Sequence, residues 1–236
     1  ICVMAVNNET GIIQPIKEIS NLCKKYNDYF FCDCIQALGK IPLDMENIGI
    51  DFSTFASHKI GGPQGVGVVY IGANLGNYSD IVGGGQEFGR RGGTENVLAI
   101  SSFGKALEVT LKNLLIESDN ITKLNKILVS GIKKVSSDII IVAEGADKLG
   151  SIVSIIIPNI KSETIVIALD IEGFSVSAGA ACSSGKVNSS HVLKAMGYDD
   201  NLSNSAIRIS LGWKNTEEDI INFLNILNKL SKTMNF

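Results

Sequence analysis

The sequence has few of the features that mark membrane, secreted or nucleic-acid-binding proteins. Charged residues make up only 19% of the 236 residues and the net charge is −3, so we expect no basic surface for nucleic acid or anionic lipid. The longest apolar runs, around Ile155–Ile157, are far shorter than a membrane span. No charged n-region followed by a cleavable apolar stretch opens the chain. A cytoplasmic protein without nucleic-acid or membrane partners is predicted.

The five cysteines lack the paired C-x-x-C spacing of a structural zinc site, and their odd number argues against a disulfide framework. Four lie in apolar segments, where small core residues are expected: Cys2, Cys23, Cys32 and Cys34. Cys182 differs, because the small residues Ser177–Ala181 precede it and Ser183–Lys186 follow it. An inert small hydrophobe is the ordinary reading of a cysteine, but this composition favours an accessible, mobile loop.

The first half of the chain alternates predicted strands with helices. Strands are expected at 2–6, 29–33, 51–56 and 66–71, and a helix opens at Pro15. This alternation predicts an α/β fold with a mostly parallel sheet covered by helices. Ligand chemistry in such folds gathers beyond the carboxyl ends of the strands, where Asn8, Asp33 and Lys59 fall.

The second half is predicted to form a smaller α+β domain. We place the boundary in the polar stretch 117–120, which gives domains of residues 1–116 and 117–236. The elements expected around and beyond it are helices at 94–115, 121–134, 162–169 and 190–196, strands at 138–143, 151–157, 174–177 and 206–210, and a last helix with a capping box at 216–219. The first residue is Ile within a strand-like run, so we expect the chain to continue something that began upstream.

Four polar residues at or near strand ends are candidates for chemistry. Lys59, in "FASHKIGGPQGVG", follows an apolar run and has no other charge in the next five positions. It is either an ordinary surface lysine or a lysine suited to Schiff-base chemistry. Asp33 is either an N-cap or a carboxylate that keeps a pyridinium nitrogen protonated, as pyridoxal phosphate (PLP) requires. Gln36 follows it and could donate to a phenolate oxygen. Asn8 is otherwise a turn residue.

Taken as a whole, the sequence resembles a known family. The blocks "VNNETGIIQPI", "DCIQALGKIPLD", "FASHKIGGPQGVG", "GGGQEFGRRGGTENV", "SAGAACSSGKVNSSHVLKAMG" and "IRISLGWKNTEEDI" occur in the order found in cysteine desulfurases of the NifS/IscS type. These are PLP-dependent enzymes of fold-type I in the class V aminotransferase group. The resemblance covers essentially the entire chain. It implies that residues 1–116 are the C-terminal part of a large PLP-binding domain, and 117–236 a small domain with the mobile cysteine loop.

The resemblance also implies roles for single residues. Lys59 resembles the lysine that binds PLP covalently, Asp33 the partner of the pyridine nitrogen, and Gln36 a donor to the ring oxygen. The other cofactor contacts implied are His58 and Ser57 at the phosphate, Asn8 near the ring oxygen and the substrate carboxylate, and Thr94 at the phosphate of the other subunit of a homodimer. Arg208 resembles the arginine that clamps the substrate carboxylate, a task that suits a guanidinium fork. The alternative for Arg208 is an edge-strand charge facing water.

Cys182 matches the family's nucleophile and persulfide carrier. The implied reaction removes sulfur from L-cysteine, leaves L-alanine and an enzyme persulfide, and delivers sulfur to an iron–sulfur scaffold or a thiolation enzyme. No resident metal is implied, although Cys182 could ligate an iron–sulfur cluster transiently. His191 is expected to be structural or to support the site, and Arg90 and Arg91 to lie in a solvated loop.

The chain departs from the family pattern in two places. A serine common in the family falls at Ala56, with Ser57 one position later, which affects one phosphate hydrogen bond. Roughly the family's N-terminal third, which carries a phosphate-cradling helix start and a ring-stacking histidine, has no counterpart here. The chain is then a fragment, one of two polypeptides, or a decayed remnant. A selenocysteine lyase, a class V aminotransferase and a catalytically silent binding protein stay open as alternatives.

Overall fold

The computed structural model describes residues 1–236 except 74, 77–78, 80 and 180–188. Those residues form two compact units. Unit 1 comprises Ile1–Val6 and Ile13–Leu115, and unit 2 comprises Asn7–Ile12 and Ile116–Phe236. Within the described residues, no helix is both long and apolar enough to cross a bilayer.

Unit 1 is built on a four-stranded sheet in the order β1-β2-β3-β4. β1 (Cys2–Met4), β2 (Phe31–Asp33) and β3 (Phe52–Ala56) run parallel, and β4 (Gly67–Ile71) pairs antiparallel with β3. The predicted α/β class with a mostly parallel sheet is confirmed. The strands are one or two residues shorter than the apolar runs that predicted them.

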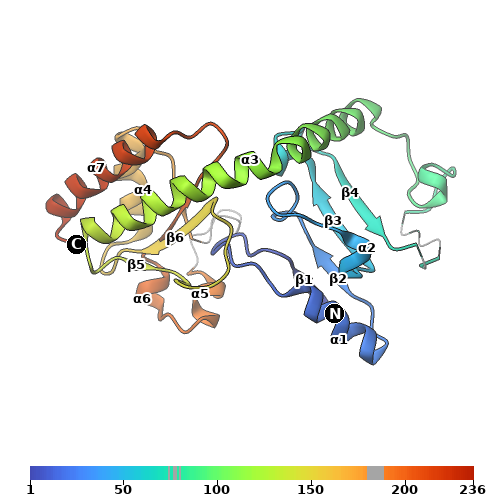
Figure 1. The fold of residues 1–236 in the computed structure, drawn as a ribbon, viewed down its shortest axis with the longest axis horizontal. Coiled ribbons are helices and arrows are strands. Elements are labelled where there is room, and N and C mark those ends of the chain that lie inside the picture. Colours follow the sequence, from blue (N-terminus) through green and yellow to red (C-terminus); the bar gives the residue numbers. More distant parts are fainter. Residues whose placement is uncertain (74, 77–78, 80, 180–188) are drawn as a thin grey trace. The chain divides into compact units, whose positions relative to one another are not determined.

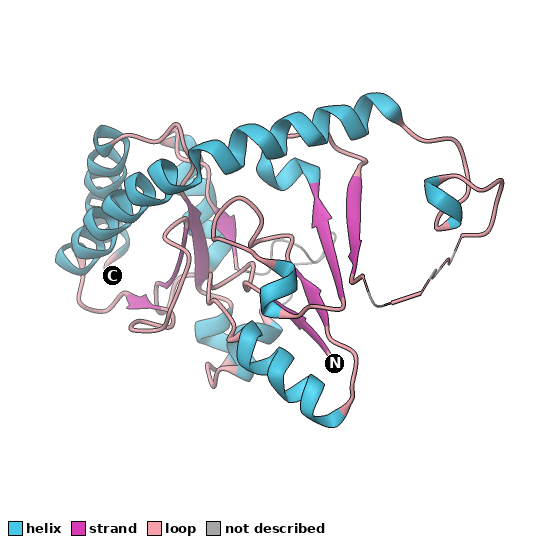
Figure 2. Ribbon diagram, turned by 45° about the vertical axis from the view of Figure 1, so that its right-hand side comes forward, coloured by secondary structure: helices cyan, strands magenta, loops and turns pink. Residues whose placement is uncertain are grey.

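The helices of unit 1 have clear sequence causes. α1 (Ile16–Tyr26) begins directly after Pro15, and its buried residues Ile16, Ser20 and Cys23 recur at helical spacing. α2 (Met45–Ile48) is capped by the Asp44 side chain and was not predicted. Short 3₁₀ turns, η1 (Ser57–Ile60) and η2 (Glu87–Gly89), interrupt the loops, and the other described residues between β4 and α3 form loop (Figure 2).

A single helix of 39 residues, α3 (Val97–Val135), replaces the two predicted helices. The polar stretch 117–120 that was interpreted as a boundary lies inside this helix. The stretch 117–120 contains neither Gly nor Pro, and the summed helix propensity cost of its Ser, Asp and Asn is only about 1–2 kcal/mol. The burial of Leu124 and Leu128 in the turns that follow offsets this cost. The start is also later than predicted, because Thr94 precedes the helix.

Unit 2 contains a second four-stranded sheet, entirely antiparallel, in the order β5-β6-β8-β7. The strands are β5 (Ile140–Ile141), β6 (Ile152–Ile156), β7 (Ser177–Ala178) and β8 (Ala206–Ser210). The helices besides α3 are α4 (Ser162–Ile171), α5 (His191–Ala195), α6 (Asp200–Ser203) and α7 (Glu217–Met234). α7 has the predicted capping box.

Both faces of this second sheet are covered (Figure 1). On one face, side chains of the strands pack with residues of α3, α4 and α7, among them Leu128, Leu169 and Leu227. On the other face, Ile156 packs with Leu193 of α5. All five residues of β6 are therefore buried, and four of them are apolar, so the strand does not alternate between apolar and polar residues.

Candidate functional site

The carboxyl end of β2 carries Asp33 and, shortly after it, Gln36. Asp33 pairs with Thr54 of β3, and its Oδ1 accepts a hydrogen bond from the Ile35 N–H (2.9 Å), which turns the chain out of the strand. The Gln36 Oε1 accepts a hydrogen bond from the Lys40 Nζ (2.9 Å). The amide oxygen is thus used locally, and the NH₂ group of Gln36 is the end that can donate to a ligand.

The carboxyl end of β3, the neighbouring parallel strand, leads directly into η1 with Ser57, His58 and Lys59. Gly61 closes this turn with φ 79°, and its N–H donates to the Ser57 carbonyl. A left-handed residue at this point is readily supplied only by glycine. The side chains of His58 and Lys59 are exposed, whereas Ser57 is fully buried.

Ser57 has an unusual environment for a hydroxyl. Its Oγ is buried and has no hydrogen-bond partner among the described residues. A Cβ at Gly62 would lie 2.1 Å from this Oγ, so only glycine leaves the hydroxyl its space. A buried hydroxyl without a partner costs about 1–3 kcal/mol. The position therefore suits a group that brings its own acceptor, such as a phosphate.

Thr94 also belongs to unit 1 and lies exposed in the loop before α3. Its predicted contact with the phosphate involves a second subunit, so for one chain it stays a prediction.

In unit 1, the ends of two neighbouring parallel strands, β2 and β3, carry most of the predicted cofactor residues: Asp33, Gln36, Ser57, His58 and Lys59.

Arg208 and Asn8 meet within unit 2. Arg208 lies on β8, and its Nη1 donates to the Asn8 carbonyl (2.9 Å) while its Nη2 donates to the Ser177 Oγ (3.5 Å). The alternative of an edge-strand charge facing water is wrong, because β8 lies between β6 and β7. The Arg208 Nε is buried and has no partner among the described residues, so this N–H is a donor that a ligand carboxylate could use.

The segment Asn7–Ile12 contains a residue that the sequence interpretation missed. Glu9 is buried, and its Oε2 accepts a hydrogen bond of 2.5 Å from the Ser190 Oγ. Ser190 caps α5, since its Oγ also accepts from the Leu193 N–H. Little in the sequence signalled this burial, because Glu9 stands among the polar residues of "NNET" and only the fold brings Ser190 to it. Cys182 falls outside the described residues.

The cysteine predictions are confirmed in part. Cys23, Cys32 and Cys34 are buried, but Cys2 is exposed because the first residues of β1 are open to solvent. Among the described residues, no group of three or more His, Cys, Asp or Glu side chains could hold a metal ion.

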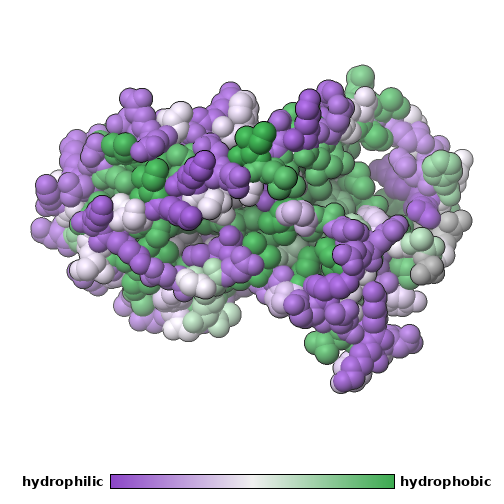
Figure 3. All heavy atoms as spheres, in the orientation of Figure 1, coloured by the Kyte–Doolittle hydropathy of each residue, from purple (hydrophilic) through white to green (hydrophobic). Residues whose placement is uncertain are grey.

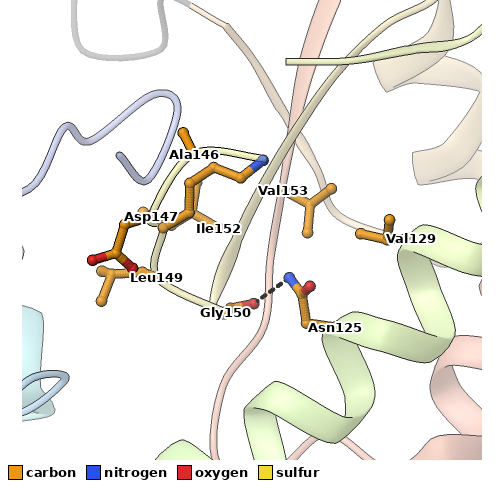
Figure 4. A pocket seen from close by; sticks show the side chains of 9 residues that line it. Asn125, Val129, Ala146, Asp147, Leu149, Gly150, Ile152 and Val153 are labelled. Carbon is orange, nitrogen blue, oxygen red and sulfur yellow. Dashed lines mark hydrogen bonds between the residues drawn. The ribbon is translucent and has the colours of Figure 1, made fainter. Parts of the chain in front are cut away.

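A cavity of about 270 Å³ lies in unit 2, away from every predicted site residue (Figure 4). The Asn125 Nδ2 at its wall donates to the Gly150 carbonyl (2.7 Å). Burial lowers the pKa of the Lys148 amine, whose Nζ donates to the Val142 carbonyl (2.9 Å). The remaining lining residues are Val129, Ala146, Asp147, Leu149, Ile152 and Val153. Two of its polar side chains, Asn125 and Lys148, are therefore bonded to the protein itself.

Comparison with known proteins decides the family. The profile of "Aminotransferase class-V" matches residues 1–223. The chain belongs to the class-V aminotransferase family. The class-V match confirms the resemblance that the sequence blocks predicted, and membership implies PLP chemistry in general terms.

Individual class-V relatives point to one subgroup. The chain is 38% identical over 234 residues to the "Cysteine desulfurase IscS" of Clostridium botulinum (strain Hall), and 36% identical over 230 residues to that of Dictyoglomus turgidum. In each case the match covers 98% of this chain. Among solved structures, the NifS-like protein from Rickettsia africae ESF-5 superposes with a TM-score of 0.89 at 36% identity, over 98% of this chain and 61% of that one.

The chain spans 59% and 58% of the length of the two curated class-V relatives. The residues of unit 1 fit a PLP group nonetheless, on one structural observation. The buried Ser57 hydroxyl lacks a partner and lies in the same turn as Lys59. This turn therefore offers a hydroxyl donor to the phosphate of PLP and, beside it, an amine that can react with its aldehyde.

Proposed function

We propose that this protein takes part in PLP-dependent cysteine desulfuration, in which L-cysteine gives up its sulfur and leaves as L-alanine. The single observation that carries the proposal is the grouping of Asp33, Ser57 and Lys59 at the ends of two neighbouring parallel strands. The similarity to cysteine desulfurases, at 38% identity for the Clostridium botulinum protein, supports the choice of substrate.

The residues of unit 1 would hold the cofactor. Lys59 would bind its aldehyde, Ser57 and His58 its phosphate, Asp33 its pyridine nitrogen and Gln36 its ring oxygen. When bound, PLP supplies an electron sink for the bond-breaking at the substrate α-carbon. The Asp33 carboxylate would keep the ring nitrogen protonated, because an adjacent negative charge favours the charged form of the ring.

The substrate would be oriented from unit 2. Arg208 already donates to the Asn8 carbonyl, so its guanidinium is fixed in direction, and its buried Nε remains to donate to the carboxylate of cysteine. The free amine of Lys59 would remove the α-proton and later return one to the alanine skeleton. The Cys182 thiolate would then attack the substrate sulfur, so that the C–S bond breaks and the sulfur stays on Cys182 as a persulfide.

The partners follow from this chemistry. A persulfide must be passed to a thiol acceptor, for which an iron–sulfur scaffold protein or a thiolation enzyme is proposed. A homodimer in which Thr94 reaches the phosphate of the second subunit is proposed as well, together with a cytoplasmic location.

Alanine formation from L-cysteine in the presence of added PLP tests the function. We expect alanine and sulfide from the wild-type chain, and Lys59→Arg to lower kcat by about a hundredfold or more because arginine cannot act as the base. Lys105→Arg, another exposed lysine of unit 1, is the matched control and should keep full activity. Amino-group transfer to an α-keto acid without sulfur release would instead select an aminotransferase, and equal activity of both variants would contradict the proposal.

A further inference from the structure

Two cysteines flank the proposed cofactor residue Asp33. Cys32 lies in β2 and Cys34 follows the end of the strand, so both project to the same side while Asp33 projects to the other. Both cysteines are fully buried. Their thiols form a hydrogen bond with an Sγ–Sγ distance of 3.7 Å.

The neighbouring strand β3 holds this pair in contact. The Cys32 carbonyl accepts a hydrogen bond from the Ser53 Oγ (2.8 Å), and the Cys34 N–H donates to the Thr54 carbonyl (3.2 Å). Both cysteine backbones are therefore fixed against consecutive residues of β3. The contact between the sulfur atoms is a consequence of sheet register and does not depend on a mobile loop.

The two thiols are chemically unequal. The side-chain hydrogen bond with Cys32 lowers the pKa of the Cys34 thiol. The pKa of Cys32 is raised by the same bond with Cys34 and by burial. Cys34 is thus the member that ionises first, next to a protonated thiol. Of the two, the thiol that ionises first would attack an oxidant, and its neighbour would resolve the product.

We propose that Cys32 and Cys34 are a modification site, a dithiol that a peroxide oxidises to a disulfide across Asp33. The Cys34 thiolate attacks one oxygen of hydrogen peroxide and becomes a sulfenic acid, releasing hydroxide. The Cys32 sulfur then attacks the Cys34 sulfur, the S–O bond breaks, and water leaves with the Cys32 proton. The two thiols lose two electrons and the peroxide gains them, giving two water molecules once the hydroxide is protonated.

Disulfide formation would disturb Asp33. The sulfur atoms must close from 3.7 Å to a bond length of about 2.05 Å, and the disulfide then closes a covalent ring that includes the backbone between them. That backbone is Asp33 itself, whose carboxylate is held by the Ile35 N–H. This consequence rests on the proposed function: with the carboxylate moved, the ring nitrogen of PLP loses its partner and PLP binding weakens.

Mass spectrometry tests the pair without reference to PLP. Trypsin releases residues 26–40, which contain Cys32 and Cys34 and no other cysteine. The full chain is treated with hydrogen peroxide, quenched, denatured and alkylated with iodoacetamide without reductant. We expect this peptide to be two hydrogen atoms lighter and unalkylated, and dithiothreitol to restore both alkylation sites. Cys23, buried on α1 without a cysteine neighbour among the described residues, is the internal control and should stay alkylatable. Two alkyl groups on peptide 26–40, or a sulfinic acid on one cysteine, would overturn the proposal.

PLP titration tests the coupling to Asp33. In a Cys182→Ala background, which removes the proposed nucleophile from the oxidation, the oxidised chain should bind PLP about tenfold more weakly, the effect of one lost hydrogen bond to a charged group. Dithiothreitol should reverse this loss, and Cys32→Ala and Cys34→Ala should bind PLP equally well before and after peroxide. A disulfide with unchanged PLP affinity would overturn the coupling. Failure of the reduced chain to bind PLP would count against the proposed function, and the mass measurement would still decide on the pair.

Discussion

The two units of the chain differ in how completely their apolar side chains are covered. In unit 2, helices cover both faces of the antiparallel sheet. As a result, β6 is buried throughout, and Leu128, Leu169 and Leu227 share one core. Unit 1 leaves apolar side chains exposed, including Val69 on β4 and Leu98 near the start of α3. Hydrophobic spheres are visible at the surface in Figure 3. The comparison teaches that two proposed tasks fall on two sheets that differ in packing: the better-covered sheet carries the proposed substrate clamp, and the more open sheet carries the proposed cofactor residues.

Truncation of the unit 2 core gives the largest expected effect on this comparison. Leu128 of α3 is fully buried, and Leu128→Ala should lower the free energy of unfolding by about 2–5 kcal/mol, because it removes packed methyl groups and leaves a cavity. Leu111 lies in the same helix but is 51% exposed, so Leu111→Ala should change stability by less than about 0.5 kcal/mol. Urea unfolding compares the two, and equal losses would break the distinction between the units.

Arg208→Lys comes next and separates substrate binding from cofactor binding. Lysine keeps the charge but lacks the paired N–H donors of the guanidinium group, so we expect KM for L-cysteine to rise about tenfold. PLP affinity should be unchanged, because the residues proposed to bind PLP lie in unit 1. Lys214→Ala, an exposed cation of unit 2, is the control and should leave KM unchanged. Steady-state kinetics with a PLP titration measures both. A fall in PLP affinity with an unaltered KM would reverse the assignment of the two units.

The capping box of α7 gives the smallest effect, confined to unit 2. Thr216→Ala should cost about 1 kcal/mol of stability, since the Asp219 N–H loses its acceptor. The backbone N–H of Thr216 holds the pKa of the Asp219 carboxyl below its usual value. Its contribution is therefore present above the unfolded-state pKa and is lost as the pH falls through the folded-state pKa.

Thermal unfolding measured at several pH values tests the role of the Asp219 carboxylate in the capping box. The destabilisation by Asp219→Asn should be seen at neutral pH and should vanish in acid. Glu217→Gln, also in the first turn of α7 but outside the box, serves as the control. A destabilisation by Asp219→Asn that is the same at every pH would contradict the role of its charge.

Much of the fold follows from local pattern, and the failures have physical causes. β8 was predicted with its observed bounds, because Ala206–Ser210 alternates cleanly and lies between turn residues. The single helix α3 was missed because local polarity at 117–120 suggested a break, whereas propensity differences of a fraction of a kcal/mol per residue are easily overridden by packing. α2 and α6 are too short to show a period.

The candidate site was predictable only as far as strand ends can be placed. Asp33 and Lys59 follow apolar runs, so their position beyond β2 and β3 could be inferred. The burial of the Ser57 hydroxyl could not, because it depends on the return of the chain at Gly62. The same holds for Glu9 and Ser190, which are 181 positions apart in sequence and meet only in the folded unit.

Mapping of the covalent cofactor tests the central claim most directly. The chain is incubated with PLP, reduced with borohydride, digested and examined by mass spectrometry. The account predicts one pyridoxyl group at Lys59, absent from Lys59→Arg, with Lys105 and the other exposed lysines of unit 1 unmodified. A pyridoxyl group spread over surface lysines in both proteins, or none at Lys59, would contradict it.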